Sequence, residues 1–354
     1  MNEADAETID LAVDCVTRLL GGSVTDAHVV RAGGNNRIIR VEQRGEQPRA
    51  VKIYFRHPAD KRNRLATEFG ALSFLWRHGV RRTPQPLAID HDRAMAIYSF
   101  IEGARITPGA ITAGDILAAV RMLRTLHDHM DADGARDFGP ASEAFFSLDG
   151  LLSNLRDRYL RHVPVQSSDP IFEEYQAFRD GPLVRALDMV ERAARADAAR
   201  LGEPDDKEIQ RSMRILSPSD FGFHNAIRPA SGDLVFLDFE YFGWDDPAKT
   251  VCDFCYHPAM QLSPQLRKLF TASAVPMLGG AELMARIIRL SPIFGLKWCL
   301  ILLNEFLPEG RLRRGLAEGR SSDGALTIQL AKARAMLERV MKGRERDEFP
   351  EIAS

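Results

Sequence analysis

Cysteine is scarce in this sequence: the 354 residues include four, Cys15, Cys252, Cys255 and Cys299. So few thiols exclude a small disulfide-framed domain and are typical of a protein from a reducing compartment. Cys252 and Cys255 form a C-x-x-C motif with His257 close by. No second pair of ligands with metal-binding spacing accompanies the motif, and its surroundings do not resemble a thioredoxin site. We therefore expect two buried, unreactive cysteines and neither a zinc site nor a redox pair.

The sequence also lacks an excess of charge of either sign. Its 47 Lys and Arg residues nearly balance 49 Asp and Glu residues, which leaves a formal net charge of -2. A balanced chain has no general attraction for nucleic acid or for an anionic membrane. A small-molecule or protein partner is expected instead.

Signals for export or membrane insertion are missing as well. The N-terminal segment MNEADAETID is acidic and has neither the basic nor the apolar region of a signal peptide. The most apolar run, GLKWCLILLNEF, contains Lys297 and is too short to span a bilayer by itself. The sequence thus predicts a soluble, cytoplasmic protein.

Hydrophobic residues make up 45% of the chain, which is ample for a sizeable core. A chain of 354 residues is also too long for one simple compact unit, so we expect two lobes. The expected elements are a helix over 7–20, strands over 37–43 and 49–55, a helix over 61–78, a strand pair ending within 94–103 and a helix over 116–129. Beyond that point the chain is mostly helical. The change in pattern near residues 100–109 predicts one lobe over residues 1–102 and a second over residues 103–354.

A lysine and a glutamate in the N-terminal part stand out from their periodic surroundings. Alternation along the strand puts Lys52 on the face opposite Val51. In the next helix, a rotation of about 100° per residue places Glu68 between Leu72 and Leu75, inside the apolar stripe. A carboxylate in that position is buried and needs a cationic partner.

A second group of polar residues follows from the stretch SPSDFGFHN, residues 217–225, which contains Asp220 and Asn225. The short strand MRILS precedes this loop, and a hairpin with the turn PASGD follows it and ends at Asp238. We expect the loop and the hairpin end to bring the three side chains together. Carboxylate and amide oxygens are ligands that magnesium takes in proteins, usually with phosphate oxygens and water.

The order of five motifs in this chain resembles that of the aminoglycoside phosphotransferase and choline kinase group. The motifs are RAGGNNRIIRV, AVKIYF, Glu68, SDFGFHN and LDFEYFGWDDP. The resemblance covers roughly residues 25–260. It implies an α+β, two-lobed fold similar to that of protein kinases, with a small N-terminal lobe on an antiparallel sheet and a larger, mainly helical C-terminal lobe. It also implies ATP- and magnesium-dependent transfer of the γ-phosphate to a hydroxyl of a small molecule, such as a sugar, an amino alcohol or an aminoglycoside-like compound.

The glycine-rich segment is the first part of the nucleotide site that the resemblance implies. Gly33, Gly34, Asn35 and Asn36 would form a turn over the nucleotide phosphates, where small side chains let backbone amides approach closely. An ordinary hairpin turn is the alternative for this segment.

The resemblance assigns the next part of the nucleotide site to the strand and helix described above. Lys52 would bind the α- and β-phosphates, and Glu68 would hold Lys52 in place. A solvated strand lysine is the alternative, which the burial of Glu68 disfavours. Ala50 shares the strand face of Lys52, and its small side chain suits a packed adenine. The backbone groups expected to bind the adenine edge are those of Ser99, Phe100 and Ile101.

For the reaction itself, the resemblance makes Asp220 the residue that accepts or orients the proton of the attacking hydroxyl. Asn225 and Asp238 would hold magnesium, which bridges phosphate oxygens. The alternative for the loop residues is capping of the loop backbone, a common role of Asp and Asn.

The sequence departs from the pattern of the group at two places. Residues 218–219 read Pro-Ser before Asp220, where the group usually has His-Gly, and His224 is a possible replacement for the missing histidine. Thr250 stands where the group commonly has an aspartate, with Asp253 one turn later. The second departure predicts that the helix after the Asp238 segment is anchored differently from the corresponding helix of the group.

The acceptor is the least defined part of the prediction. Aromatic and acidic residues between 143 and 180 would suit an amine through cation-π and charge contacts, but Phe172, Tyr175 and Phe178 are also spaced like the core face of a helix. The main alternative function is a nucleotide-binding pseudokinase that acts as an interaction or regulatory module, because the histidine is missing. A protein kinase is less favoured, since no Ala-Pro-Glu motif ends an activation segment. The oligomeric state is not predicted.

Overall fold

The structure, a computed structural model, describes four stretches of the chain: residues 3–32, 36–54, 62–310 and 323–346. Packing divides the chain into two compact units. The first unit consists of Met1–Thr107, His129–Ser142 and Pro218–Gly243. The second unit consists of Pro108–Asp128, Glu143–Ser217 and Trp244–Ser354. The expected lobe boundary between residues 102 and 103 stays a prediction.

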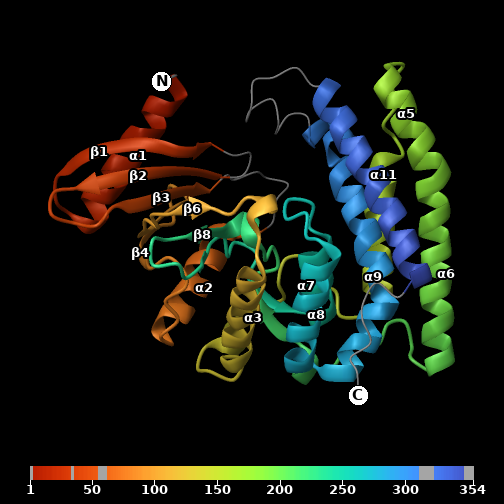
Figure 1. The fold of residues 1–354 in the computed structure, drawn as a ribbon. Coiled ribbons are helices and arrows are strands. Elements are labelled where there is room, and N and C mark those ends of the chain that lie inside the picture. The colour runs from red at the N-terminus through yellow and green to blue at the C-terminus, as the bar shows by residue number, and fades with distance from the viewer. Residues whose placement is uncertain (1–2, 33–35, 55–61, 311–322, 347–354) are drawn as a thin grey trace. The chain divides into compact units, whose positions relative to one another are not determined.

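A five-stranded sheet with the strand order β1-β2-β3-β5-β4 forms the centre of the first unit (Figure 1). Its strands are β1 (Val24–Ala32), β2 (Asn36–Gln43), β3 (Arg49–Tyr54), β4 (Pro86–Asp90) and β5 (Met95–Ser99). All neighbours pair antiparallel, and Lys52 in the central strand pairs with Ile38 on one side and Ala96 on the other. The strands expected from the sequence are confirmed, although the prediction for the second one extended to Phe55, which lies outside the described residues.

Two helices, α1 (Glu3–Leu20) and α2 (Arg64–Arg77), pack against this sheet. Helix α1 covers the face that carries Val51, where the buried side chains of α1, β2, β3 and β5 form one apolar cluster. Helix α2 supplies Glu68 to the opposite face, which carries Lys52. The N-terminus of α2 is capped by Asn63, whose side chain accepts a hydrogen bond from the Ala66 amide. The strand alternation therefore separates an apolar face from a face with ionic contacts, as expected.

A smaller sheet in the same unit contains the predicted hairpin. It has the strand order β6-β8-β9, with β6 (Ala104–Arg105), β8 (Ala226–Arg228) and β9 (Val235–Phe236). The loop before β8 ends in a short 3-10 helix, η5 (Phe223–Asn225), and a second one, η2 (Ala135–Asp137), lies earlier in the chain. The hairpin turns at Gly232, whose positive φ of 89° favours glycine.

The second unit is mostly helical. Its α-helices are α3 (Ala113–Asp128), α4 (Leu148–His162), α5 (Pro170–Phe178), α6 (Val184–Leu201), α7 (Pro247–Tyr256), α8 (Pro264–Leu278), α9 (Gly280–Leu303) and α11 (Asp323–Arg346). Its shorter elements are the helices η1 (Pro108–Ala110), η3 (Arg179–Leu183), η4 (Arg211–Met213) and η6 (Asn304–Phe306), and the strands β7 (Ile215–Ser217) and β10 (Gly243–Asp245). Strand β10 begins at the last residue of the first unit and pairs with β7.

Helix α9 lies at the centre of the second unit, where it packs against α4, α6, α7, α8 and α11. Figure 1 shows α9 and α11 side by side. The apolar run that the sequence presents as too short for a membrane span belongs to a longer helical stretch, Gly280–Phe306, whose length and composition would allow it to cross a bilayer. However, 67% of its most apolar window is buried inside the structure. This burial is what a core helix requires.

The aromatic residues considered for acceptor binding belong mainly to this core. Phe172, Tyr175 and Phe178 are buried along one face of α5, and the Tyr175 ring stacks on Phe306 at 4.3 Å between centroids. Their helical spacing therefore reflects packing, which was the alternative considered for them.

The cysteines behave as expected for buried thiols. All four are buried, and none belongs to a disulfide in the part of the chain that the structure describes. Burial raises the pKa of the Cys252 thiol well above its usual range. A thiol in this state is a poor nucleophile.

Candidate active site

An ion pair between Lys52 and Glu68 forms the base of the site. Lys52 Nζ lies 2.6 Å from Glu68 Oε2, and the two residues are 6% and 3% exposed. The predicted burial of Glu68 and its need for a cation are both confirmed. Lys52 lies on the sheet face that packs toward α2, and Glu68 lies on the side of α2 that faces the sheet. The two side chains therefore meet between the two elements.

Two buried tyrosines extend this pair. Tyr54 shares the strand face of Lys52, and its hydroxyl group donates a hydrogen bond to Glu68 Oε2 at 2.6 Å. The hydroxyl groups of Tyr54 and Tyr98 lie 2.8 Å apart. Burial, together with the negative charge of Glu68, raises the pKa of both tyrosines well above the usual range. Both hydroxyls thus stay protonated and can hold the carboxylate in place.

Lys52 also contacts the segment after the hairpin. Its Nζ lies 2.7 Å from Asp238 Oδ1 and 3.4 Å from Glu240 Oε2. Burial by itself lowers the pKa of Lys52, but the Asp238, Glu68 and Glu240 carboxylates outweigh this effect and raise the pKa well above its usual range. The ammonium group is therefore charged and surrounded by carboxylates.

The hairpin end is fixed by backbone contacts with both halves of the site. The Leu237 amide donates to the Asn225 carbonyl at 2.8 Å, and the Phe239 amide donates to Glu68 Oε1 at 3.2 Å. Asp238 stands between these two anchors with φ at 65°, in the left-handed region. The hairpin therefore brings Asp238 next to Asn225, as the sequence predicts.

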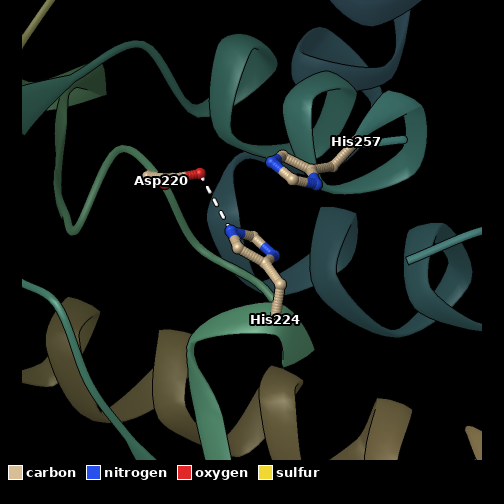
Figure 2. A group of neighbouring side chains, drawn as sticks. All are labelled: Asp220, His224 and His257. Atoms are coloured by element: carbon tan, nitrogen blue, oxygen red, sulfur yellow. Dashed lines mark hydrogen bonds and ion pairs between the residues drawn. The ribbon is translucent and has the colours of Figure 1, made fainter. Parts of the chain in front are cut away.

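The loop that carries Asp220 is held by its own side chains. Asn225 Nδ2 donates to the Asp220 carbonyl at 3.0 Å and reaches the carboxylate oxygen Oδ2 at 3.3 Å. His224 Nε2 lies 3.1 Å from the other carboxylate oxygen, Oδ1, and Figure 2 shows the imidazole ring directed at Asp220. The expected grouping of Asp220 and Asn225 is confirmed. The predicted replacement of the missing histidine by His224 has a direct contact to support it.

These residues line a cavity of about 570 Å³ within the first unit. Of the predicted site residues, those that line it are Asn36, Ala50, Lys52, Glu68, Ser99, Phe100, Ile101, Asp220, Asn225 and Asp238. Gly33, Gly34 and Asn35 lie outside the described residues. At the rim, the Phe100 amide already donates to the Pro48 carbonyl at 3.0 Å. Among the backbone hydrogen bonds of the described residues outside helices and strands, none is donated by the Ile101 amide.

Glu240 is a site residue that the sequence reasoning missed. It is 3% exposed, accepts a hydrogen bond from Asn36 Nδ2 at 2.6 Å and lies 3.6 Å from Arg64 Nη1. Glu240 thus links the end of the glycine-rich segment to the residues around Lys52. Its position two residues after Asp238 follows no strand or helix period, because the segment is not a regular strand there, so no local pattern indicated it.

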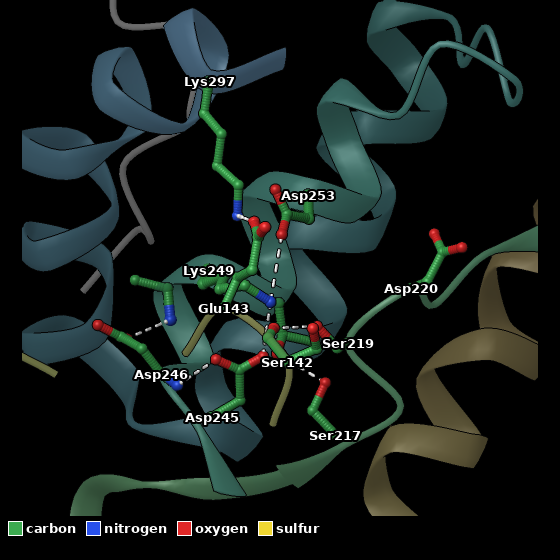
Figure 3. Close-up of polar contacts among 12 residues, drawn as sticks. Ser142, Glu143, Ser217, Ser219, Asp220, Asp245, Asp246, Lys249, Asp253 and Lys297 are labelled. Carbon is green, nitrogen blue, oxygen red and sulfur yellow. Dashed lines mark hydrogen bonds and ion pairs between the residues drawn. The ribbon is translucent and has the colours of Figure 1, made fainter. Parts of the chain in front are cut away.

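In the second unit, the helix that follows the hairpin has its own anchors. Figure 3 shows Lys249 between Asp245 and Asp253, with its Nζ 2.7 Å and 3.4 Å from their carboxylate oxygens. Thr250 donates its hydroxyl to Ser217 Oγ at 3.1 Å. Thr250 and Asp253 therefore anchor α7 by contacts of different kinds.

The acidic residues before this helix serve the fold of the second unit. Asp246 is fully buried, caps α7 through the Ala248 amide and pairs with Arg286 at 2.6 Å. Burial raises the pKa of Asp245 to about 6, although the adjacent Lys249 ammonium acts in the opposite direction. Neither aspartate lines the cavity of the first unit. Both aspartates therefore have structural contacts in the second unit.

Comparisons with solved structures found similar folds along almost the whole chain. A spectinomycin phosphotransferase in complex with ADP and spectinomycin has a TM-score of 0.65 at 9% identity, with 94% of this chain and 98% of that chain covered. A choline kinase from Streptococcus pneumoniae has a TM-score of 0.59 at 15% identity, with 93% and 98% covered. A choline/ethanolamine kinase family protein from Mesorhizobium loti has a TM-score of 0.57 at 18% identity, with 97% and 98% covered. At these identities the likeness establishes the fold.

The sequence itself supplies the family. No curated protein sequence matched the chain. The model of the phosphotransferase enzyme family matches residues 26–283, which include the strands, the Lys52–Glu68 pair and the Asp220 loop. This range is well over half of the 354 residues. The chain therefore belongs to the phosphotransferase enzyme family.

Proposed function

We propose that the protein transfers the γ-phosphate of ATP to a hydroxyl group of a small molecule in a magnesium-dependent reaction. The observation that carries this proposal is the convergence of Lys52, Glu68, Asp220, Asn225 and Asp238 on one cavity. A buried lysine held by a glutamate, an aspartate in a fixed loop and two oxygen ligands are the parts that phosphoryl transfer requires.

The nucleotide is assigned to the sheet side of the cavity. Lys52 binds phosphate oxygens there, while Ala50 and the segment from Ser99 to Ile101 accommodate adenine. The cavity volume of about 570 Å³ is within the range of small-molecule sites. Nucleotide binding is further supported by the similar structures, one of which contains ADP and another AMP.

Asn225 and Asp238 fit a magnesium ion by the chemistry of their donor atoms. Because the Asn225 amide nitrogen is engaged with Asp220, its amide oxygen is the atom left to act as a ligand. Asp238 adds a carboxylate, and hard divalent cations prefer such oxygens. When bound, the ion offsets negative charge on the phosphate groups.

Asp220 is assigned to the acceptor. Its carboxylate accepts the proton as the hydroxyl oxygen bonds to the γ-phosphorus, and the bond to the bridging oxygen breaks to release ADP. Lys52 holds the phosphates throughout, and Glu68 keeps the ammonium group oriented.

The acceptor class is proposed from the similar structures, which are named for spectinomycin and for choline. Sugars, amino alcohols and aminoglycoside-like compounds are therefore the first compounds to test. The experiment is a screen of hydroxylated metabolites for acceptor-dependent ADP release from magnesium ATP, with mass spectrometry of the product. We expect at least one acceptor to gain a phosphate group. Tight ATP binding without turnover on any acceptor would favour the pseudokinase instead.

A further inference from the structure

The contact between His224 and Asp220 joins two residues of the same loop that are four positions apart. His224 Nε2 lies 3.1 Å from Asp220 Oδ1, and their side chains are 17% and 34% exposed. The ring is thus mostly covered, whereas the Asp220 side chain is partly exposed, and Figure 2 shows the ring directed at the carboxylate. A carboxylate oxygen only accepts hydrogen bonds, so the histidine donates.

The loop geometry explains why a residue four positions away can make this contact. The 3-10 turn Phe223–Asn225 folds the chain back toward Asp220. Two buried rings hold the loop on the protein: Phe221 packs on Phe236 at 5.0 Å between centroids, and Phe223 is 1% exposed. The backbone positions of His224 and Asp220 are therefore fixed by apolar packing.

Two polar side chains of the same loop contact Asp220. His224 is directed at Oδ1, while Asn225 Nδ2 makes its shorter contact, 3.0 Å, with the Asp220 carbonyl and a longer one, 3.3 Å, with Oδ2. The imidazole contact is thus the shorter of the two on the carboxylate. Without the imidazole contact, Oδ1 would lose a donor that helps to fix the side-chain rotamer of Asp220.

We infer that His224 is a positioning residue: its Nε2–H holds Oδ1 of Asp220 so that the other carboxylate oxygen meets the acceptor hydroxyl. This role rests on the proposed function, in which Asp220 receives the proton of that hydroxyl. This role would replace that of the histidine that is missing before Asp220, where the chain has Pro218 and Ser219. Orientation is a large part of catalysis, and a displacement of about 1 Å can cost roughly 100-fold in rate.

The test compares two amides of different length. Gln can place its amide nitrogen where His224 has Nε2, whereas Asn is too short to reach Asp220. We expect His224→Asn to lower kcat by about 10- to 100-fold with little change in the KM for ATP, and His224→Gln to restore kcat to within about threefold of the wild type. ADP release from magnesium ATP is measured with the best acceptor of the screen, or with water if the screen yields none. Calorimetry with magnesium ADP checks nucleotide affinity.

The outcomes separate this inference from the proposed function. Loss of turnover in Asp220→Asn with wild-type kcat in His224→Asn would overturn the inference and leave the function intact. Equal impairment of the Gln and Asn variants would also overturn it, because the donor would then not matter. Undiminished turnover in Asp220→Asn would overturn the proposed function.

A crystal structure of His224→Asn tests the positioning without any turnover. We expect the Asp220 carboxylate to move by about 1 Å or more, or to change rotamer, when the donor is withdrawn. An unchanged Asp220 side chain would contradict the inference, even for a protein with no catalytic activity.

Discussion

Ser219 and Asp238, the residues on either side of the candidate reaction centre, share an uncommon backbone conformation. Their φ angles are 67° and 65°, in the left-handed region that most side chains avoid. Such a residue costs on the order of 1 kcal/mol compared with glycine. Ser219 offsets part of this cost, because its hydroxyl donates to the Ser142 carbonyl at 3.0 Å. The loop before Asp220 is thus tied down by a side chain that glycine would not offer.

The effect of the Ser219 hydroxyl group and the effect of its backbone strain can be separated by substitution. Ser219→Ala removes the hydroxyl and keeps the strain, whereas Ser219→Gly removes both. We expect the Gly variant to be more stable than the Ala variant by about 1 kcal/mol in urea unfolding, because glycine adopts a positive φ without strain. An Ala variant as stable as the Gly variant would contradict the left-handed conformation at this position.

Glu68→Gln should affect nucleotide use more than folding. The amide keeps the shape and can still accept the hydrogen bond from Tyr54, but it loses the charge that orients Lys52. Breaking a buried ion pair on one side typically costs about 3 to 5 kcal/mol, yet Lys52 retains Asp238 and Glu240, so we expect a loss of only about 1 to 3 kcal/mol in unfolding free energy. We expect kcat/KM for ATP to fall by at least about tenfold, because a misplaced Lys52 no longer meets the phosphates.

A matched control for this change is Glu46→Gln. Glu46 pairs with Arg49 at 3.0 Å, but its side chain is 60% exposed, so its loss should change stability by less than about 1 kcal/mol and leave ATP kinetics unaltered. Wild-type ATP kinetics in Glu68→Gln would remove the Lys52–Glu68 pair from the proposed site.

At the scale of elements, the sequence predicted those features that a local period determines. The opposite faces of β3 and the burial of Glu68 in α2 follow from periods of two and about 3.6 residues, and both are confirmed. The hairpin end at Asp238 followed from turn chemistry. The full length of α9 did not, because Pro292 and Lys297 interrupt its apolar pattern, and burial in the second unit overrides both signals.

Contacts between distant parts of the chain were beyond such reasoning. Asn36 and Glu240 are 204 positions apart, and Ser219 and Ser142 are 77 apart. No local pattern encodes which buried polar groups will meet over such separations.

A buried histidine between α4 and α5 makes the stability of the second unit depend on pH. His162, at the end of α4, is 1% exposed, and its Nδ1 lies within hydrogen-bond distance of the Tyr175 hydroxyl, at 2.9 Å. Burial lowers the pKa of His162 from 6.5 to about 4. Between these values the unfolded chain binds more protons than the folded one, so the unfolding free energy falls as the pH falls through this window. The full effect is about 3 kcal/mol.

This dependence can be isolated with His162→Asn, which has a side-chain oxygen near the position of Nδ1 but does not titrate. Carboxylates titrate in the same range, so the comparison is between the urea unfolding free energies of the two proteins across the window. We expect the wild type to lose about 3 kcal/mol more than the variant as the pH is lowered from about 7 to about 4. Parallel pH profiles would contradict a buried, neutral His162.

At the scale of the whole molecule, the candidate machinery comes from distant chain segments that pack into one unit. Lys52 and Glu68 belong to the N-terminal segment, while Asp220, Asn225 and Asp238 belong to the segment Pro218–Gly243. The candidate residues for nucleotide, metal and acceptor therefore lie on one compact unit.

The proposed function assigns the metal and the nucleotide to Asp238 and the acceptor to Asp220, both in the first unit. The most direct test is to measure magnesium ATP binding by calorimetry and turnover by ADP release in Asp220→Asn and Asp238→Asn. We expect Asp238→Asn to weaken binding, because it removes a charged oxygen ligand from a hard cation. Asp220→Asn should keep wild-type binding and lower turnover by about 10²- to 10⁴-fold, the scale of a positioned acid-base group. Unchanged turnover in Asp220→Asn, or equal loss of binding in both variants, would contradict the division of roles.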